Sequence, residues 1–287
     1  MTLRRKAVAA RAAVLVALLA APALLPLAPP DAVDLGRRGA TAGGAPDGAG
    51  PSPSRPLGVD ELGRCRLSRL LSGLRVSLLC AVAGGVVCIV VGSVVGVVAG
   101  WFGGRIDAAL MRTVDFADSI PAFLMVVVAQ AGIRAARGPL AGGDARLVAL
   151  FLILGLTTWF TCARLVRAKT LWLKSREFIV AARAVGTPAA RIFTRHLLPN
   201  LASAIGVSAA LAAPRIVLLE AFLSFLGLGV EAPRVSLGSL ARTGLDSVHA
   251  ADLRLAPVSI PCAVLAFLMI LLGGFRTARV GAENRVA

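Results

Sequence analysis

Residues 76–100 read VSLLCAVAGGVVCIVVGSVVGVVAG, a stretch of 25 residues without one charged side chain. A helix needs about 20 apolar residues to cross a hydrocarbon core that is about 30 Å thick. The rest of the chain is similar, since 57% of its 287 residues are hydrophobic and only 16% are charged, whereas about a quarter of a soluble domain is charged. The composition therefore predicts an all-α integral membrane protein, because backbone polar groups in lipid must be satisfied within the protein.

Five more apolar runs are bounded by charged or turn residues, and with residues 76–100 they predict six transmembrane helices. These runs are 12–28, 120–132, 147–163, 201–227 and 256–275. The run 120–132 is short and contains Gln130, but an even number of crossings suits the charge balance described next. The run 12–28 also fits a secretory signal peptide, because Arg4, Arg5 and Lys6 precede it and small residues end it.

The formal net charge of +16 would indicate nucleic-acid binding in a soluble protein. In a membrane protein the excess of Lys and Arg instead marks the cytoplasmic segments. With six crossings, 17 basic and 5 acidic residues fall on one side and 13 basic and 9 acidic residues on the other, a net +12 against +4. We therefore expect both termini in the cytoplasm and no nucleic-acid partner. The more basic segments are 1–11, 101–118, 164–200 and 276–287, and the others are 29–75, 134–146 and 228–255.

The segment between the first two crossings changes character along its length. Residues 29–55 are rich in Pro, Gly, Ala and Ser and are expected to form a flexible external linker. Residues 62–75 place Leu67, Leu70, Leu71 and Leu74 among four arginines, which predicts an amphipathic helix on the membrane surface. The expected organisation is a first helix, linker and surface helix over residues 1–71, a transmembrane domain over residues 72–276 and a cytoplasmic tail over residues 277–287.

Small residues recur every four positions along the second crossing, and this spacing predicts a stripe at which another helix can approach closely. The stripe consists of Gly84, Cys88, Gly92, Gly96 and Gly100.

Glu220 lies within the fifth apolar run, where an ionised side chain costs about 3 kcal/mol and must face protein or water. Two interpretations stay open for it: a place on a translocation path, or a structural hydrogen bond to a neighbouring helix. Arg215 is five residues away and poorly aligned for an ion pair on one helix face.

The sequence contains none of the common catalytic motifs. His196 and His249 are the only histidines, they fall on opposite sides of the membrane in this topology, and neither HExxH, GxSxG nor a phosphate-binding GxxxxGK[ST] occurs. The five cysteines form no CxxC pair. We therefore expect no catalytic site, cofactor or metal, and the energy for transport must come from an ion gradient or another subunit.

The longest basic segment, residues 164–200, reads RLVRAKTLWLKSREFIVAARAVGTPAARIFTRHLLPN and has eight basic residues and one acid. Gly186 suits the left-handed position after a helix end. Thr187 and Pro188 are expected to restart a helix as N-cap and first residue, and Pro199 to stop it. The resulting pair of short helices is predicted to be a docking surface for a cytoplasmic partner or an amphipathic hairpin on the membrane surface.

Several separated motifs resemble one family. AARAVG and RHLLPN in the basic segment are similar to the cytoplasmic EAA loop of binding-protein-dependent ABC importer permeases, in the dipeptide, oligopeptide and nickel branch. PLGVDELGR (56–64), LSRLLSGLRVSLL (67–79), GWFGGRIDAALMRTVD (100–115) and SFLGLGV (224–230) resemble further parts of that branch. Their order and spacing make the resemblance more specific than one motif would be.

The resemblance implies a six-helix subunit with the type I ABC importer permease (MetI-like) architecture in a bacterial plasma membrane. Such a subunit retains its first helix, pairs with a homologous permease, docks two cytoplasmic ATPase subunits and receives substrate from an extracytoplasmic solute-binding protein. From the small-residue stripe we expect Leu at Gly92 or Gly96 to separate helices that touch backbone to backbone, with loss of the permease heterodimer. The implied ATPase-docking loop comprises Phe178, Ala181, Ala182, Gly186, Leu198 and Pro199.

The chain departs from the family pattern at three places. Val180 stands where the family usually has the Glu of EAA, Cys65 stands where an Asp is usual, and the tail FRTARVGAENRVA replaces an acidic ending. The alternative to an importer subunit is a self-sufficient channel or secondary transporter with an amphipathic internal hairpin. An integral-membrane enzyme is disfavoured, because no paired catalytic residues occur at one membrane face.

Overall fold

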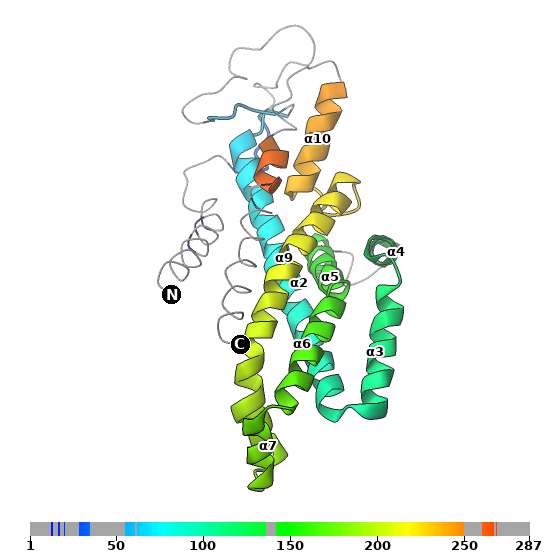
Figure 1. Cartoon of the computed structure of the whole chain (residues 1–287). Helices are drawn as coiled ribbons and strands as arrows, with labels where there is room; N and C mark the ends of the chain where they lie inside the picture. Colours follow the sequence, from blue (N-terminus) through cyan, green and yellow to red (C-terminus); the bar gives the residue numbers. More distant parts are fainter. Residues whose placement is uncertain are drawn as a thin grey trace. The chain divides into compact units, whose positions relative to one another are not determined.

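The computed structural model describes residues 29–34, 55–60, 62–135, 142–249, 260–266 and 268, together with the single residues 13, 17 and 20. Over these residues the regular structure is helical, and the isolated β-bridge there pairs Val59 with Cys65 (Figure 1). The prediction of an all-α fold is therefore confirmed for the described part of the chain.

Helix α2 runs over Arg66–Phe102 without interruption. The predicted surface helix and the second crossing are thus one continuous helix and not two. No proline separates them, and apolar packing tolerates the glycines in between. The helix ends where Gly103 and Gly104 take positive φ angles of 69° and 55°, a conformation that glycine adopts without steric strain.

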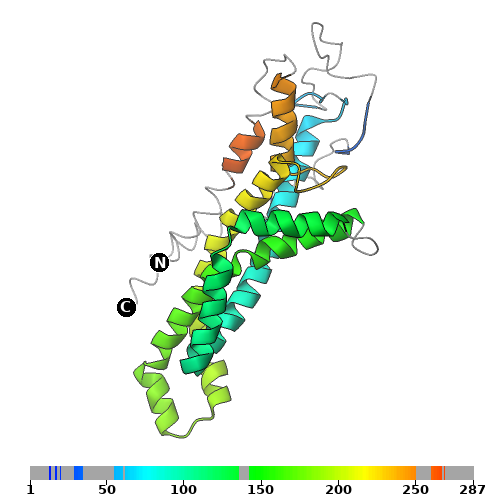
Figure 2. The same cartoon turned by 90° about the vertical axis from the view of Figure 1, so that its right-hand side faces the viewer.

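Two bent helix pairs follow α2. Helix α3 (Gly104–Asp118) meets α4 (Ala122–Ala135) at 79°, and α5 (Gly143–Leu156) meets α6 (Trp159–Lys174) at 42°. Pro121 lies in the first break, and its ring opposes a continuous helix. The predicted fourth run, 147–163, therefore straddles a break. Figure 2 shows α4 and α5 side by side, both turned away from the direction of α3 and α6.

A helical hairpin leads into the second long helix. Its elements are α7 (Glu177–Ala184), α8 (Ala189–Ile192) and the π-helical turn η3 (Phe193–Leu197), after which α9 covers Leu198–Phe225. The expectation that Pro199 stops a helix is wrong, because Pro199 lies in the first turn of α9. The backbone N–H of Leu198 donates to the carbonyl of Phe193, and this wider turn accommodates a residue that has no N–H of its own.

Two helices are long and apolar enough to cross a membrane, namely Arg66–Phe102 and the continuous helical stretch Ala189–Phe225. Each bent pair can form one further crossing, so the described residues contain two to four spans. The predicted first and sixth runs, 12–28 and 256–275, lie largely outside the described residues, and the count of six stays a prediction.

The chain divides into two compact units. The first unit comprises Met1–Cys80 and Val217–Leu271, and it includes α10 (Leu237–His249). Within it α10 packs closely on its neighbours, since a Cβ on Gly238 would lie 2.0 Å from the carbonyl oxygen of Ala221. The second unit comprises Ala81–Ile216 and Leu272–Ala287, and it contains α3 to α8.

Candidate functional site

The α7–α8 hairpin, here α7, α8 and η3 with their connections, is shaped by a glycine turn. Gly186 has a φ of 77°, which confirms the predicted left-handed conformation. Its N–H donates to the carbonyl of Arg183 at 2.9 Å, and the N–H of Thr187 donates to that of Ala182 at 3.0 Å. This bond pair is the Schellman arrangement that ends helices at glycine. The next helix begins at Ala189, after Pro188, one residue later than predicted.

The hairpin contains three fully buried apolar side chains. Ile179, Ile192 and Leu197 are fully buried, and the rings of Phe178 and His196 connect α7 to η3 with centroids 6.2 Å apart. Large apolar side chains remain on the outside, because Val185 is 86% exposed and Phe178, Val180 and Leu198 are also exposed. The hairpin therefore buries isoleucine and leucine and leaves other apolar side chains exposed.

The residues of the predicted docking loop occupy two places. Phe178, Ala181 and Gly186 are exposed on the hairpin, and Ala182 is half-buried there. Leu198 and Pro199 are exposed at the start of α9. The hairpin itself thus carries four of the six predicted residues.

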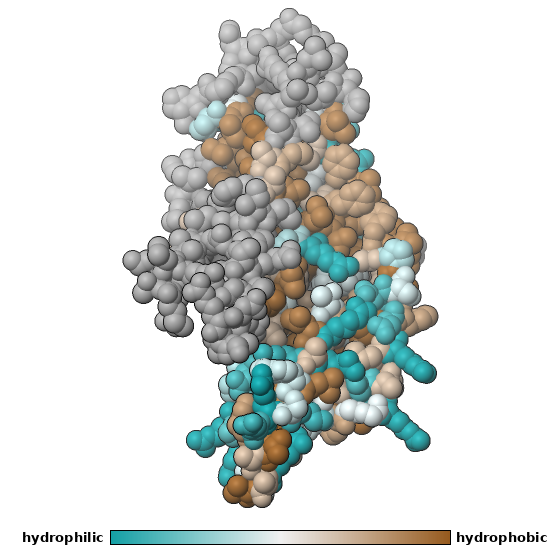
Figure 3. Space-filling model, in the orientation of Figure 1, coloured by the Kyte–Doolittle hydropathy of each residue, from teal (hydrophilic) through white to brown (hydrophobic). Residues whose placement is uncertain are grey.

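Positive charge surrounds these apolar side chains. Arg176, Arg183, Arg191 and Arg195 are exposed, and Glu177 is the only acid in residues 164–200. The guanidinium of Arg176 lies 3.6 Å from the ring centroid of Trp172 at the end of α6. Figure 3 shows hydrophilic side chains gathered over the end of the second unit formed by α6, α7 and α8, with hydrophobic residues among them.

The hairpin contacts the end of α2 through Trp101, which sequence reasoning did not single out. Arg183 of α7 lies 5.4 Å from the indole centroid, and Phe193 of η3 approaches edge-on at 6.2 Å. Lys174 of α6 donates through Nζ to the backbone carbonyl of Trp101 at 2.6 Å. The available signal was a tryptophan at the end of an apolar run, a position typical of membrane interfaces.

The small-residue stripe of α2 packs inside the chain. A Cβ on Gly92, Gly96 or Gly100 would lie 2.6, 2.5 or 2.7 Å from atoms of Cys162, Ala163 or Thr170, all of which belong to α6. Cys88 donates through Sγ to the carbonyl of Thr158 at 3.5 Å, and a Cβ on Gly84 would lie 3.2 Å from the side chain of Ile216 in α9. Bulky residues in the stripe would therefore first disturb this subunit itself rather than a pairing with a second permease.

Ion pairs attach α3 to α6. Arg164 donates to Asp115 at 3.0 Å and to Asp118 at 2.8 Å, and Arg167 donates to Asp107 through both Nε and Nη2. The Arg164 pairs are exposed and contribute about 0 to 1 kcal/mol each, whereas the Arg167–Asp107 pair is half-buried. Together the pairs hold α3 against α6.

Glu220 is fully buried in the first unit and accepts hydrogen bonds from several serines. Ser77 of α2 donates to one carboxylate oxygen at 2.9 Å, and Ser224 donates to the other at 2.7 Å. Ser236, which precedes α10, hydrogen-bonds to the same carboxylate. The carboxylate thus connects α2, α9 and the start of α10. Nothing in the spacing of Glu220 alone indicated these partners.

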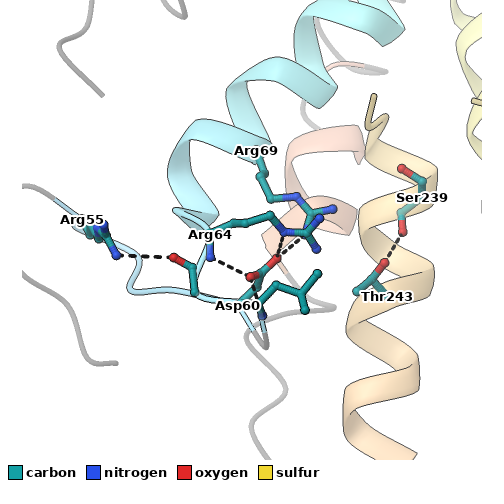
Figure 4. Close-up of polar contacts among 8 residues, drawn as sticks. Arg55, Asp60, Arg64, Arg69, Ser239 and Thr243 are labelled. Carbon is teal, nitrogen blue, oxygen red and sulfur yellow. Dashed lines mark hydrogen bonds and ion pairs between the residues drawn. The ribbon is translucent and has the colours of Figure 1, made fainter. Parts of the chain in front are cut away.

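Asp60 organises the PLGVDELGR motif. One of its oxygens accepts the backbone N–H groups of Leu62 at 3.0 Å and Arg64 at 2.8 Å, and the other accepts Arg64 Nε at 2.8 Å and Arg69 Nη1 (Figure 4). Burial by itself raises the pKa of the Asp60 carboxyl, but the hydrogen bonds from Arg64 and the charge of Arg69 outweigh it and hold the pKa below its ordinary value. The motif is therefore a turn closed on one carboxylate. Cys65 is buried beside it.

Within the described residues no group of three or more His, Cys, Asp or Glu side chains is arranged to hold a metal ion. The ring of His196 lies 6.2 Å from that of Phe178 at a tilted angle, and His249 ends α10 in the first unit.

Known proteins are similar to this chain over most of its length. Residues 92–280 match the family described as "Binding-protein-dependent transport system inner membrane component". The oligopeptide transport system permease protein OppC of Mycobacterium tuberculosis (strain ATCC 25618 / H37Rv) is 34% identical over 275 residues, which cover 96% of this chain and 89% of the relative. OppC of Escherichia coli (strain K12) is 39% identical over 193 residues, or 67% of this chain and 61% of the relative.

Among solved structures, a chain of the MetNI methionine ABC transporter in an inward-facing conformation superposes with a TM-score of 0.57. The alignment covers 75% of this chain and 96% of that chain at 22% sequence identity. At this identity the likeness shows a shared fold.

Proposed function

Because this chain belongs to the family of binding-protein-dependent transport system inner membrane components, and so is a membrane permease and not a catalytic subunit, we propose that it forms a path for small peptides in an ATP-driven importer. The peptide substrate is supported by the names of its relatives, which are oligopeptide and dipeptide transport permeases. Nickel or another small solute of the same branch is the alternative substrate.

The α7–α8 hairpin is the proposed contact with the ATPase, within residues 176–199. The supporting observation is its surface. A glycine turn joins the helices of the hairpin, and Val185, Phe178 and Val180 remain exposed among arginines. Protein interfaces use apolar anchors with a polar rim in this way. Val180 replaces the acid usual in the family, so the partner is expected to meet an apolar side chain there.

The proposed assembly contains a second homologous permease, two ATPase subunits and an extracytoplasmic solute-binding protein. In it residues 72–276 form the permease domain, and the chain crosses the membrane six times with both termini in the cytoplasm. Single cysteines in a cysteine-free background at Gly48 and Ser175 test this topology. They should react with an impermeant reagent from outside and inside respectively, and labelling of both from one side would contradict it.

The function is tested by reconstituting the four-subunit complex in proteoliposomes with its binding protein and a set of peptides. We expect ATP hydrolysis to be stimulated by the loaded binding protein, and import to require ATP. Ala181→Asp should abolish stimulation by placing an unpaired charge in the interface, whereas Ala181→Ser, which is matched in size, should retain it. Import without the ATPase would instead favour a channel or secondary transporter.

For Glu220 the proposed role is a structural connection, since its two carboxylate oxygens are occupied by serine hydroxyls from two helices. Glu220→Gln can keep most of these contacts, whereas Glu220→Ala leaves the serines unpaired in a buried site. We expect Glu220→Gln to transport peptides normally and Glu220→Ala to lower the thermal stability of the subunit. Normal stability together with lost transport in both variants would place Glu220 on the translocation path.

A further inference from the structure

We propose that Trp101, the second-last residue of α2, is a positioning residue that connects the α7–α8 hairpin to α2, so that a movement of the docked hairpin is passed to this membrane-spanning helix. The inference rests on the proposed function, because it gives the attachment of the hairpin a role in coupling ATP hydrolysis to transport.

Three elements around the hairpin meet at the indole ring of Trp101. The guanidinium carbon of Arg183 in α7 lies 5.4 Å from the ring centroid, and the Nζ of Lys174 in α6 lies 6.0 Å from it. The ring of Phe193 in η3 has its centroid 6.2 Å away, with an angle of 79° between the ring planes. These distances are within the range of cation–π and edge-to-face attraction. One side chain of α2 therefore contacts α6, α7 and η3.

The backbone of Trp101 is held as firmly as its ring. Lys174 donates through Nζ to the carbonyl of Trp101 at 2.6 Å and to that of Gly100 at 3.3 Å. Carbonyls in the last turn of a helix have no partner within the helix, and a cation there satisfies them and complements the helix dipole. The ring consequently has a defined position relative to α6.

The residues of α2 that precede Trp101 pack so closely on α6 that the two helices cannot shift independently. A Cβ on Gly100 would lie 2.7 Å from the Cβ of Thr170, and one on Gly96 would lie 2.5 Å from the carbonyl oxygen of Ala163. A contact of such density transmits displacement and does not absorb it. A push on the hairpin at Arg183 or Phe193 is therefore expected to move α2 and α6 together.

The neighbouring residue Phe102 provides a matched control. It is also aromatic and lies one position further along α2, but it is 63% exposed, and its ring has no aromatic or cation–π contact with other described residues. Loss of an aromatic ring at residue 102 should therefore leave the connection intact, and loss at residue 101 should not.

The test measures ATP hydrolysis and peptide import in the same proteoliposomes, with the four-subunit complex and its binding protein. In Trp101→Ala we expect the ATPase to stay bound and to hydrolyse ATP, while the number of peptides imported per ATP falls about tenfold, the size expected when a cation–π and an edge-to-face contact are lost together. Trp101→Phe should recover most of the ratio because it keeps a ring. Phe102→Ala should match the wild type.

The outcomes separate this inference from the proposed function. A wild-type ratio of import to hydrolysis in Trp101→Ala would show that Trp101 is not the connection, while docking of the ATPase through the hairpin would stand. Absence of ATP-dependent import in the wild-type complex would remove both proposals.

Two further measurements keep the inference testable if Trp101→Ala assembles poorly. Hydrogen exchange of the purified permease pair should become about tenfold faster over Glu177–Ala184 in Trp101→Ala but not in Phe102→Ala, because local opening is favoured when the ring contacts are lost; unchanged exchange would overturn the proposal. In a double-mutant cycle, Arg183→Gln should add no loss to Trp101→Ala, since Arg183 acts through the ring. Additive losses would contradict that pairing.

Discussion

Two arginine-rich turns precede the two long helices of this protein, and they use their charge in opposite ways. In the Asp60 turn, before α2, Arg64 and Arg69 both donate to one carboxylate, and Arg69 is almost fully buried. In the α7–α8 hairpin, before α9, the arginines are exposed and Glu177 is the only acid. The charges of the first turn are paired within the turn, whereas those of the second remain exposed.

The difference separates what each turn contributes. Removing the acid at the centre of a closed turn leaves buried cations without a counterion, so the damage falls on the fold. Changing an exposed apolar side chain of the hairpin such as Val185 costs the fold little, so the damage is expected to fall on partner binding. The Asp60 turn is accordingly expected to decide stability and the hairpin to decide coupling.

The largest expected effect is that of Asp60→Asn. The amide retains an acceptor for the N–H groups of Leu62 and Arg64 but loses the charge that pairs with Arg69, and a buried ion pair broken on one side costs about 3 kcal/mol or more. Thermal unfolding of the detergent-purified subunit should show a clear loss of stability. Glu177→Gln, the matched substitution in the exposed hairpin, should stay within about 0.5 kcal/mol of wild type; equal losses in the two variants would break the comparison.

Acid should have the same effect as this substitution. The folded protein holds the pKa of Asp60 below the ordinary 3.8, so the ionised carboxylate adds stability that is complete above that value and is lost as the pH falls through the lower folded pKa. Proteolysis near Arg64, followed as the pH is lowered below about 4, should increase in the wild type. In Asp60→Asn the rate should already be high at neutral pH, and the same dependence on pH in the wild type and in Asp60→Asn would argue against the ion pair.

The second largest effect is expected for the packing of α2 against α6, the two helices whose ends contact the hairpin. Gly92→Ala places a Cβ 2.6 Å from that of Cys162, and overpacking of this kind costs about 1 to 3 kcal/mol. Because both helices contact the hairpin at their ends, we expect stability and coupling to fall together. Gly85→Ala is the control, since a Cβ there meets nothing within 4 Å. A stable Gly92→Ala protein would show that α2 and α6 can separate without loss.

Within the hairpin, Gly186→Val should destabilise the fold less than Gly92→Ala does. It should strongly reduce the coupling of ATP hydrolysis to transport. At a φ of 77° a side chain meets no neighbour within 4 Å, but it strains the backbone, by about 1 to 2 kcal/mol. The subunit should insert normally, while the loaded binding protein should stimulate ATP hydrolysis poorly. Gly186→Asn should be milder, because Asn tolerates the left-handed region. Full stimulation in Gly186→Val would separate the hairpin from coupling.

The smallest effect on the fold is expected for Val185→Ser. This side chain is 86% exposed. Its removal should therefore change the free energy of unfolding of the subunit by no more than about 0.5 kcal/mol. Copurification of the ATPase should weaken if Val185 is an apolar anchor of the interface. Ile179→Ser, in the buried core of the hairpin, should instead destabilise it, and the reverse pattern would mean that the exposed face is not the docking face.

Much of this architecture follows from local pattern. The apolar run 76–100 lies within one long helix, and Gly186 takes the left-handed conformation that its position between two short helices suggested. Hydropathy predicts the helices at residues 120–132 and 147–163 less well, because it contains no information about where a helix changes direction. Pro121 and the pair Thr157 and Thr158 bend the chain there by 79° and 42°. The prediction for Pro199 failed because the π-helical turn before it allows the helix to continue past the proline.

The sequence by itself determined the membrane class, the apolar runs that lie in α2 and α9, the family and the position of the hairpin, because these depend on residues close together in the chain: apolar runs, glycine turns and motif order. Only the tertiary structure decided which side chains act together. The packing of the stripe of α2 on α6, the hydrogen bond from Ser77 to Glu220 and the contacts of Trp101 join residues 67 to 143 positions apart. Such contacts depend on how helices approach in space, and hydropathy and spacing along one helix contain no information about that approach.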